Sequence, residues 1–144
     1  MSMKFTLLGT GDAAQVPVYG CDCSVCTRAR ASTEFRRLPC SALLEIDGKK
    51  MLIDSGITDL AERFPAGSLS HILQTHYHAD HVQGLLHLRW GKGDTIPVTG
   101  PQDEHGFADL FKHSGILDFS HTLQHGETWQ WQGITVTALA LNHS

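Results

Sequence analysis

Hydrophobic and polar residues alternate in several short stretches of the chain, and each of these stretches predicts a β-strand. Lys4–Leu8 alternates and runs into Gly9-Thr10-Gly11, a pattern typical of a strand that ends in a tight loop. Ser41–Ile46 and Lys50–Ile53 flank Asp47-Gly48, a dipeptide that favours a two-residue hairpin turn. The first third of the chain therefore predicts one strand, followed much later by a hairpin.

The rest of the chain mixes helical and extended patterns. Apolar spacing predicts short helices, and β-branched or aromatic runs predict further strands. The helices are expected over Thr58–Phe64, Val82–Trp90 and Gln102–Lys112, and the strands over His71–Gln74, Ile96–Thr99, Thr128–Trp131 and Ile134–Leu141. Residues 10–40 lack a sustained period and are interpreted as a long loop, a type that is usually functional or tied by metal. The whole pattern predicts one α/β unit with mixed connections, α+β in the broader sense.

Composition narrows the functional classes. The chain has 144 residues, the usual size of one domain, and 11 Lys and Arg against 15 Asp and Glu give a net charge of −4. This acidic balance disfavours nucleic acid as a partner. No apolar run is long enough to span a membrane, and the N-terminus does not resemble a secretory signal, so we expect a cytoplasmic protein with no membrane partner.

Three cysteines fall within six residues, at Cys21, Cys23 and Cys26. This spacing is too tight for disulfides among them, but thiolates so close together can converge on one Zn²⁺, which takes about four N or S ligands. The three would then need a fourth ligand from elsewhere. The alternative is a set of free thiols in a reducing compartment. Cys40 lies apart from this cluster and is interpreted as a buried structural thiol.

The strongest chemical pattern is His76-x-His78-x-Asp80-His81, at the end of a predicted strand. Imidazole and carboxylate groups are ligands for Zn, Mn, Fe and Ni. Residues 76 and 78 point the same way on an extended segment, and a turn would aim Asp80 and His81 at a second position. The spacing therefore favours two metals and hydrolytic chemistry. The alternative is a polar loop with a capping Asp and solvated histidines.

With these residues in view, the sequence resembles the metallo-β-lactamase superfamily of hydrolases. Residues Thr75–His81 match its HxHxDH signature, Asp54 matches its strand-end Asp, and Leu141-Asn142-His143 matches the next ligand histidine. The resemblance implies that His76, His78 and His143 hold one metal, while Asp80 and His81 begin the second. It also implies a catalytic role for Asp80. Asp54 would orient a ligand histidine, although a cap on the turn at Ser55-Gly56 is equally compatible with the sequence.

Further motifs narrow the resemblance to the phosphoribosyl 1,2-cyclic phosphate phosphodiesterases of phosphonate degradation, the PhnP family. That family implies hydrolysis of 5-phosphoribosyl 1,2-cyclic phosphate to ribose 1,5-bisphosphate, by attack of a metal-activated hydroxide on phosphorus. It also implies two active-site metals (Mn, Zn, Ni or Fe), one structural Zn on Cys21, Cys23 and Cys26, and a small phosphorylated sugar as substrate. The motifs are Gly9-Thr10-Gly11, Tyr19-Gly20-Cys21 with Ala29-Arg30, Pro39-Cys40-Ser41, Leu88-Arg89-Trp90-Gly91, Leu110-Phe111-Lys112-His113 and Leu117-Asp118-Phe119-Ser120-His121.

The resemblance implies a four-layer αβ/βα sandwich, of which this chain supplies about the N-terminal half. Residues 1–144 are then the N-terminal part of a single metallo-β-lactamase-like domain, with a cysteine-rich zinc loop at about residues 19–30. The remaining metal ligands would lie C-terminal to it, so we expect weak metal retention at the second site and little turnover from these residues alone. An RNA 3′-end endonuclease and a non-catalytic zinc-binding module stay open as alternatives, and so does a homodimer.

Overall fold

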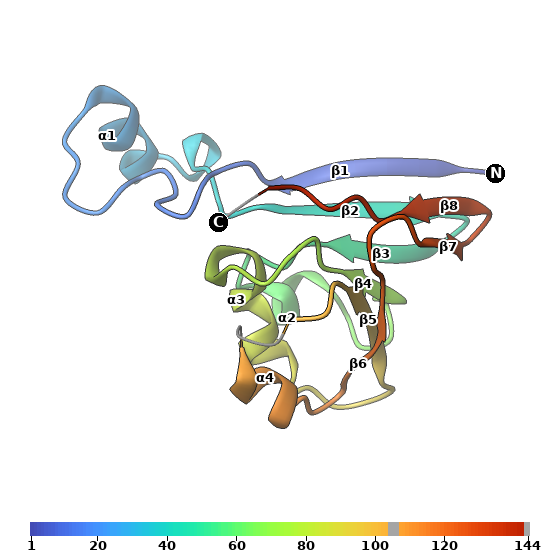
Figure 1. Cartoon of the computed structure of the whole chain (residues 1–144). Helices are drawn as coiled ribbons and strands as arrows, with labels where there is room; N and C mark the ends of the chain where they lie inside the picture. The colour runs from blue at the N-terminus through green and yellow to red at the C-terminus, as the bar shows by residue number, and fades with distance from the viewer. Residues whose placement is uncertain (104–106, 143–144) are drawn as a thin grey trace.

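A computed structural model of the chain describes residues 1–103 and 107–142. Its centre is a six-stranded sheet in sequential order, in which β1 to β3 are antiparallel and β3 to β6 are parallel (Figure 1). The mixed α/β architecture expected from the sequence is confirmed. The strands are β1 (Met3–Gly9), β2 (Ser41–Ile46), β3 (Lys49–Ile53), β4 (His71–Leu73), β5 (Ile96–Gly100) and β6 (Leu117–Thr122).

Three helices cover one face of the sheet and form the main core. They are α2 (Leu60–Arg63), α3 (Ala79–Leu88) and α4 (Ala108–Lys112). Leu60, Val82 and Leu85 from α2 and α3 are fully buried against Leu52 and Ile72 of the sheet. Helix α3 begins three residues earlier than predicted, because its first turn contains the polar residues of the HxHxDH motif rather than apolar ones. Helix α4 is shorter than predicted.

The opposite face of the sheet carries a second hairpin, formed by β7 (Thr128–Trp131) and β8 (Ile134–Thr137). Trp131 packs against Leu44, Ile46 and Met51 of the sheet. In register with Leu44 and Ile46, the β1 residues Met3, Phe5 and Leu7 form an apolar row on this same face, and these three are largely exposed. This uncovered row is of the kind that usually packs against further protein.

A segment predicted to be a loop contains α1 (Ser24–Ala31) and the 3₁₀ turn η1 (Thr33–Phe35). The loop prediction was wrong here because α1 buries only Cys26 and Ala29, which leaves no apolar period to detect. Cys23 caps the helix instead, since its Sγ accepts from the Cys26 N–H at 3.4 Å. Helix α1 and its loop project past the ends of β1 and β2, away from α2 to α4 (Figure 1).

Within residues 1–103 and 107–142, none of the helices combines the length and the apolar character needed to cross a membrane.

Candidate metal centre

The HxHxDH segment connects the end of β4 to the start of α3, and a buried glutamine holds it in place. Gln74 follows β4 directly and is only 1% exposed. Its Oε1 accepts from Ser55 Oγ at 2.7 Å, and its Nε2 donates to the carbonyl oxygen of His81 at 2.9 Å. Both ends of the segment are therefore tied to the residues that follow β3.

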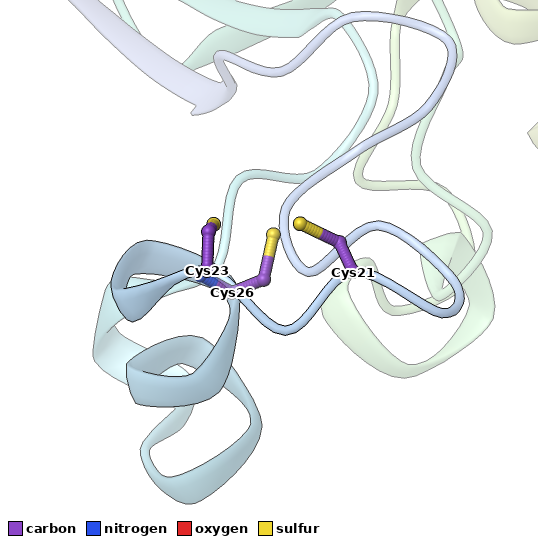
Figure 2. Close-up of side chains that lie close together, drawn as sticks. All are labelled: Cys21, Cys23 and Cys26. Carbon is purple, nitrogen blue, oxygen red and sulfur yellow. The ribbon is translucent and has the colours of Figure 1, made fainter.

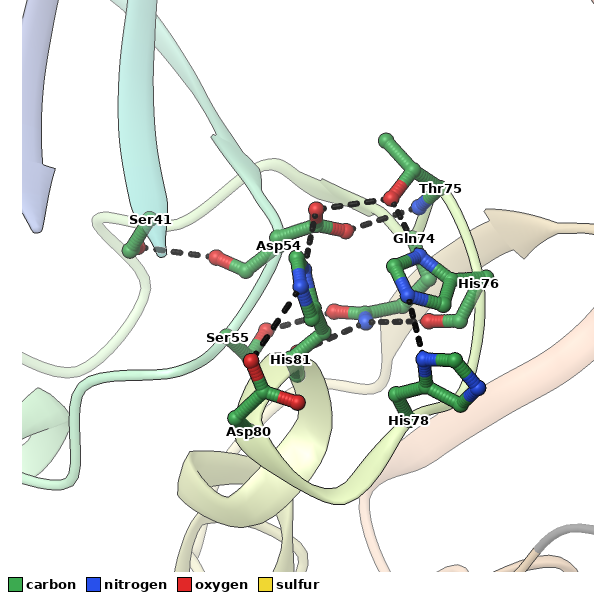
Figure 3. A network of polar contacts seen from close by, with 9 residues as sticks. All are labelled: Ser41, Asp54, Ser55, Gln74, Thr75, His76, His78, Asp80 and His81. Atoms are coloured by element: carbon green, nitrogen blue, oxygen red, sulfur yellow. Dashed lines mark hydrogen bonds and ion pairs between the residues drawn. The ribbon is translucent and has the colours of Figure 1, made fainter. Parts of the chain in front are cut away.

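Asp54 is the organising residue of the site. It follows β3 in a left-handed conformation (φ of 56°) and is 3% exposed. Its carboxylate accepts from the Thr75 N–H and the Thr75 hydroxyl, both at 2.7 Å, and from His81 Nδ1 at 2.8 Å (Figure 3). Between the two roles that the sequence left open, the structure therefore places Asp54 against a histidine of the motif. With the proton on Nδ1, the lone pair of His81 Nε2 is directed away from Asp54.

The four predicted motif residues converge in two neighbouring pairs. His76 Nε2 lies 3.1 Å from His78 Nδ1, and His81 Nε2 lies 3.4 Å from Asp80 Oδ2. The rings of His76 and His81 are 4.2 Å apart, so the two pairs form one cluster at the carboxyl end of β4 (Figure 3). Two ligand atoms that share one ion at about 2.1 Å are separated by roughly 3.0–3.4 Å, so the separation within each pair fits a divalent cation.

Close packing of the backbone around Gly56 supports the cluster. A Cβ atom added at Gly56 would collide with the carbonyl oxygens of Asp80 and Cys40. The Ser55 N–H donates to the carbonyl of His81 at 2.7 Å. Only a glycine at position 56 lets the chain after β3 approach α3 this closely. His143, the fifth predicted metal ligand, lies outside the described residues.

Tyr77 is a residue that the sequence analysis missed, although it stands between two ligand histidines. Its ring lies 5.2 Å from that of Phe111 and 6.4 Å from that of Phe119, and its hydroxyl approaches Gly100. Burial, together with the carboxylates of Asp103 and Asp54, raises the pKa of Tyr77 well above its usual range. The only local signal is an aromatic residue between two polar ones. Tyr77 thus anchors the His76–His78 segment in the core.

Cys40 also differs from its predicted role as a buried structural thiol. The side chain is half-buried and lies beside the site, with Cys40 Sγ, a carboxylate oxygen of Asp54 and a ring nitrogen of His81 all within 4.8 Å of one another. Burial and the carboxylates of Asp54 and Asp80 raise the pKa of the Cys40 thiol. No sequence signal marked this placement, because residues 40, 54 and 81 come from separate elements.

The cysteine cluster forms a second candidate metal site, remote from the first in the fold. Cys21, Cys23 and Cys26 have their sulfur atoms within 4.8 Å of one another, and within the described ranges the group has these three members (Figure 2). The Val18 N–H donates to Cys26 Sγ at 3.4 Å. Three thiols in this arrangement fit a zinc ion as the sequence analysis proposed.

The thiols of this cluster differ in acidity. Hydrogen bonds from the Cys26 backbone N–H and from the thiols of Cys21 and Cys26 lower the pKa of Cys23 to about 7. The Val18 N–H acts in the same direction on Cys26, but burial and the two neighbouring thiols outweigh it and raise the pKa of Cys26. Cys23 therefore loses its proton to a cation more readily than Cys26 does.

Comparisons with known proteins give a consistent set of similarities. The model of the metallo-beta-lactamase superfamily matches residues 37–137. A ribonuclease Z from Methanosarcina acetivorans is 28% identical over 99% of this chain and 45% of its own length.

Two solved structures are also similar. The structure of a diphosphatase from the PhnP family has a TM-score of 0.75 and 29% identity, over 94% of this chain and 56% of the other. Zinc-bound PqqB from Methylobacterium extorquens shares the fold, with a TM-score of 0.72 and 20% identity, over 97% of this chain and 56% of the other. The chain spans about half the length of these proteins.

Proposed function

Because this chain belongs to the metallo-beta-lactamase superfamily, whose members are typically hydrolases, we propose that it contributes the metal centre of a metal-dependent phosphodiesterase. The observation that carries the proposal is the convergence of His76, His78, Asp80 and His81 in one cluster, with Asp54 fixing the orientation of His81. Two of the three similar proteins support a reaction at phosphorus, since a ribonuclease and a diphosphatase both cleave bonds between phosphorus and oxygen.

Each residue of the cluster would have its own role in such a site. His76 and His78 would hold one divalent ion together with His143, and Asp80 and His81 would begin the second ion's ligand set. Bound divalent ions polarise phosphoryl oxygens and acidify water. By accepting a hydrogen bond from His81 Nδ1–H, Asp54 would leave Nε2 available as a ligand. Asp80, whose Oδ2 lies 3.4 Å from His81 Nε2, would accept a hydrogen bond from the attacking water as well as ligate.

The proposed substrate is a small phosphorylated sugar, 5-phosphoribosyl 1,2-cyclic phosphate, opened to ribose 1,5-bisphosphate in phosphonate catabolism. The net charge of −4 favours a small anion over a polyanionic strand, which needs a broad basic surface. One basic residue has a structural role. The Arg89 guanidinium pairs with Asp109 Oδ2 at 2.8 Å, and its Cζ lies 4.7 Å from the centre of the Trp90 ring. The 5-phosphate is therefore expected to be held elsewhere.

The test is a substrate profile of the full-length protein loaded with Mn²⁺. We expect hydrolysis of cyclic phosphodiesters and no turnover of β-lactams or thioesters. Asp80→Asn should lower kcat about 100-fold or more, because it removes both a ligand and an acceptor for the attacking water. The matched control is Asp118→Asn, at an exposed position on β6. Turnover of β-lactams or thioesters instead of phosphodiesters would overturn the proposal.

A second candidate, an RNA 3′-end endonuclease, is favoured by the similarity to ribonuclease Z. It requires RNA binding that weakens steeply as salt concentration rises, because each contacted phosphate releases a counterion. Measuring the affinity for a tRNA precursor between low and moderate salt separates the two candidates. Tight, salt-dependent binding favours the endonuclease, and its absence favours the small cyclic phosphate.

A further inference from the structure

The metal cluster and the segment that precedes β2 lie at the same edge of the six-stranded sheet. Strand β2 is antiparallel to β3, and β3 is parallel to β4, so the start of β2 meets the ends of β3 and β4 (Figure 1). The HxHxDH segment follows β4, whereas Arg37 lies four residues before the start of β2. Arg37 and Cys40 are three residues apart, a span of at most about 11 Å, and Cys40 lies beside Asp54 and His81. A ligand that extends from the metal centre toward β2 therefore comes within reach of Arg37.

The backbone of Arg37 is fixed by a short ladder that lies beyond the sheet. The Arg37 N–H donates to the Val16 carbonyl at 2.9 Å, and the Arg37 carbonyl accepts from the Val16 N–H at 3.0 Å. The Gly11 N–H donates to the Leu38 carbonyl at 2.7 Å. A Cβ atom added at Gly11 would lie 2.6 Å from the Arg37 carbonyl oxygen, so only glycine permits this approach. Arg37 is therefore held at its backbone, while the residue as a whole is exposed to solvent.

The other arginines of the chain already have contacts within the fold. All 11 Lys and Arg residues fall in the described ranges, so they can be compared directly. Arg28 lies over the Phe35 ring, Arg30 and Arg36 donate to the Val18 and Ala29 carbonyls, and Arg63 and Arg89 pair with Asp59 and Asp109. Among the described residues, the Arg37 side chain has no hydrogen bond, ion pair or ring contact. Its guanidinium is therefore available to a ligand.

The lysines leave one alternative near this edge. Four of them lie at the ends of β1, β3 and α3 that are far from the HxHxDH segment: Lys4, Lys49, Lys50 and Lys92. Lys112 is nearer, because the ring of its neighbour Phe111 lies 5.2 Å from that of Tyr77. Successive residues of a helix are about 100° apart around its axis, so Lys112 is turned away from the direction of Phe111. Arg37 is therefore the basic residue best placed to meet a ligand of the metal centre.

We propose that Arg37 binds the 5-phosphate of the substrate and so sets the preference for a phosphorylated sugar. This inference rests on the function proposed above. A guanidinium is always charged, and its planar fork donates two parallel hydrogen bonds to phosphate oxygens. The 5-phosphate is attached at C5, on the other side of the ribose from the 1,2-cyclic phosphate that reacts. Arg37 would hold the end of the substrate that does not react. Such a contact is equally strong in the ground state and the transition state, so its loss raises KM and leaves kcat unchanged.

The test compares two substrates of the full-length protein loaded with Mn²⁺: 5-phosphoribosyl 1,2-cyclic phosphate, and ribosyl 1,2-cyclic phosphate, which lacks the 5-phosphate. The measured quantity is the ratio of the two kcat/KM values. Arg37→Ala should lower this ratio about 10- to 100-fold, through a higher KM for the phosphorylated substrate alone. Arg37→Lys keeps the charge without the fork and should restore part of the ratio. Arg36→Ala, at the adjacent exposed arginine, and Lys112→Ala are the matched controls and should keep the ratio of the wild type.

The other outcomes separate the two proposals. If the wild type hydrolyses both substrates and Arg37→Ala keeps the ratio, the 5-phosphate is bound elsewhere and the role of Arg37 is wrong, while the phosphodiesterase stands. An equal loss on both substrates in Arg37→Ala would show a structural role and would also overturn the inference. The same is true if Arg36→Ala or Lys112→Ala lowers the ratio as much as Arg37→Ala does. A wild type that hydrolyses neither substrate contradicts the proposed function itself, and the role of Arg37 falls with it.

Discussion

The two candidate metal sites of this chain are built in different ways. The His76–His81 cluster is held by Asp54 and Gln74, which are 3% and 1% exposed. Their hydrogen bonds connect the residues after β3, the residues after β4 and the first turn of α3. The cysteine cluster lies on a projecting segment in which α1 buries only two residues. The first is organised by the protein core, whereas we expect the second to become rigid only when it binds an ion.

The largest expected effect comes from Asp54→Ala, which removes the support of the first site. The N–H and hydroxyl of Thr75 and the Nδ1–H of His81 all lose their acceptor. We expect metal affinity at this site to fall about 10–100-fold and unfolding free energy to fall by about 3 kcal/mol. Isothermal titration with Mn²⁺ and urea unfolding measure the two effects.

The control for Asp54→Ala is Asp59→Ala. The Asp59 side chain is 38% exposed and forms an i,i+4 pair with Arg63 at 2.8 Å, so its removal should cost about 0.5 kcal/mol or less. Equal losses in the two variants would mean that Asp54 contributes no more than a surface carboxylate.

Substitution of Tyr77 tests whether the core sets the spacing of the two histidines. Tyr77→Ala should cost about 3 kcal/mol of stability and weaken Mn²⁺ binding, because it empties the space beside Phe111 and Phe119. Tyr77→Phe keeps the ring and should restore most of both properties. Metal binding that is equally weak in the two variants would show that the hydroxyl, and not the ring, positions the segment.

The pH dependence of the unfolding free energy tests the packing of the six-stranded sheet without changing a proposed metal ligand. His71 is buried under Trp129, with its Nε2 2.6 Å from Thr99 Oγ1, and burial together with His121 lowers the pKa of His71 to about 4. The unfolded chain binds this proton near pH 6.5, so stability should be highest above that pH. It should then fall by up to about 3 kcal/mol between pH 6.5 and 4.

Urea unfolding across this pH range measures the effect, with His71→Gln as the comparison. The variant lacks the titrating ring and should show a flatter dependence on pH than the wild type. Identical slopes in the two proteins would assign the acid sensitivity to other groups.

The smallest expected effect concerns the packing of the cysteine segment. The guanidinium of Arg28 lies 4.1 Å from the centre of the Phe35 ring, which joins α1 to η1. Arg28→Ala should reduce the local stability of this segment by about 0.5–1 kcal/mol, measured by amide exchange in α1. Amides in β2 and β3 should not change. A change in those strands would show that the projecting segment and the six-stranded sheet unfold together.

Much of the six-stranded sheet and of the candidate metal centre could be predicted from the sequence. The hairpin of β2 and β3 follows from Asp47-Gly48 between two apolar runs, and the grouping of His76, His78, Asp80 and His81 follows from their spacing within six residues. The predicted superfamily and fold class are confirmed, with the chain consistent with half of the domain. Local patterns were sufficient for these features because their contacts are close in sequence.

The remaining features depend on contacts that a local pattern does not contain. Asp54 and His81 are 27 residues apart, so the choice between a turn cap and a histidine partner required the fold. Cys40 and Tyr77 acquire their roles from β3, α3 and α4. Helix α1 was missed because sulfur capping, rather than an amphipathic period, defines its start.

Amide hydrogen exchange of the metal-stripped protein tests most directly the claim that one site is preformed and the other is not. The Thr75 N–H, bonded to Asp54, and the Ser55 N–H, bonded to His81, should stay protected without metal. The N–H groups of Val18 and Cys26, bonded to sulfur, should exchange rapidly until zinc is added. Rapid exchange at Thr75 and Ser55 in the stripped protein would contradict the account.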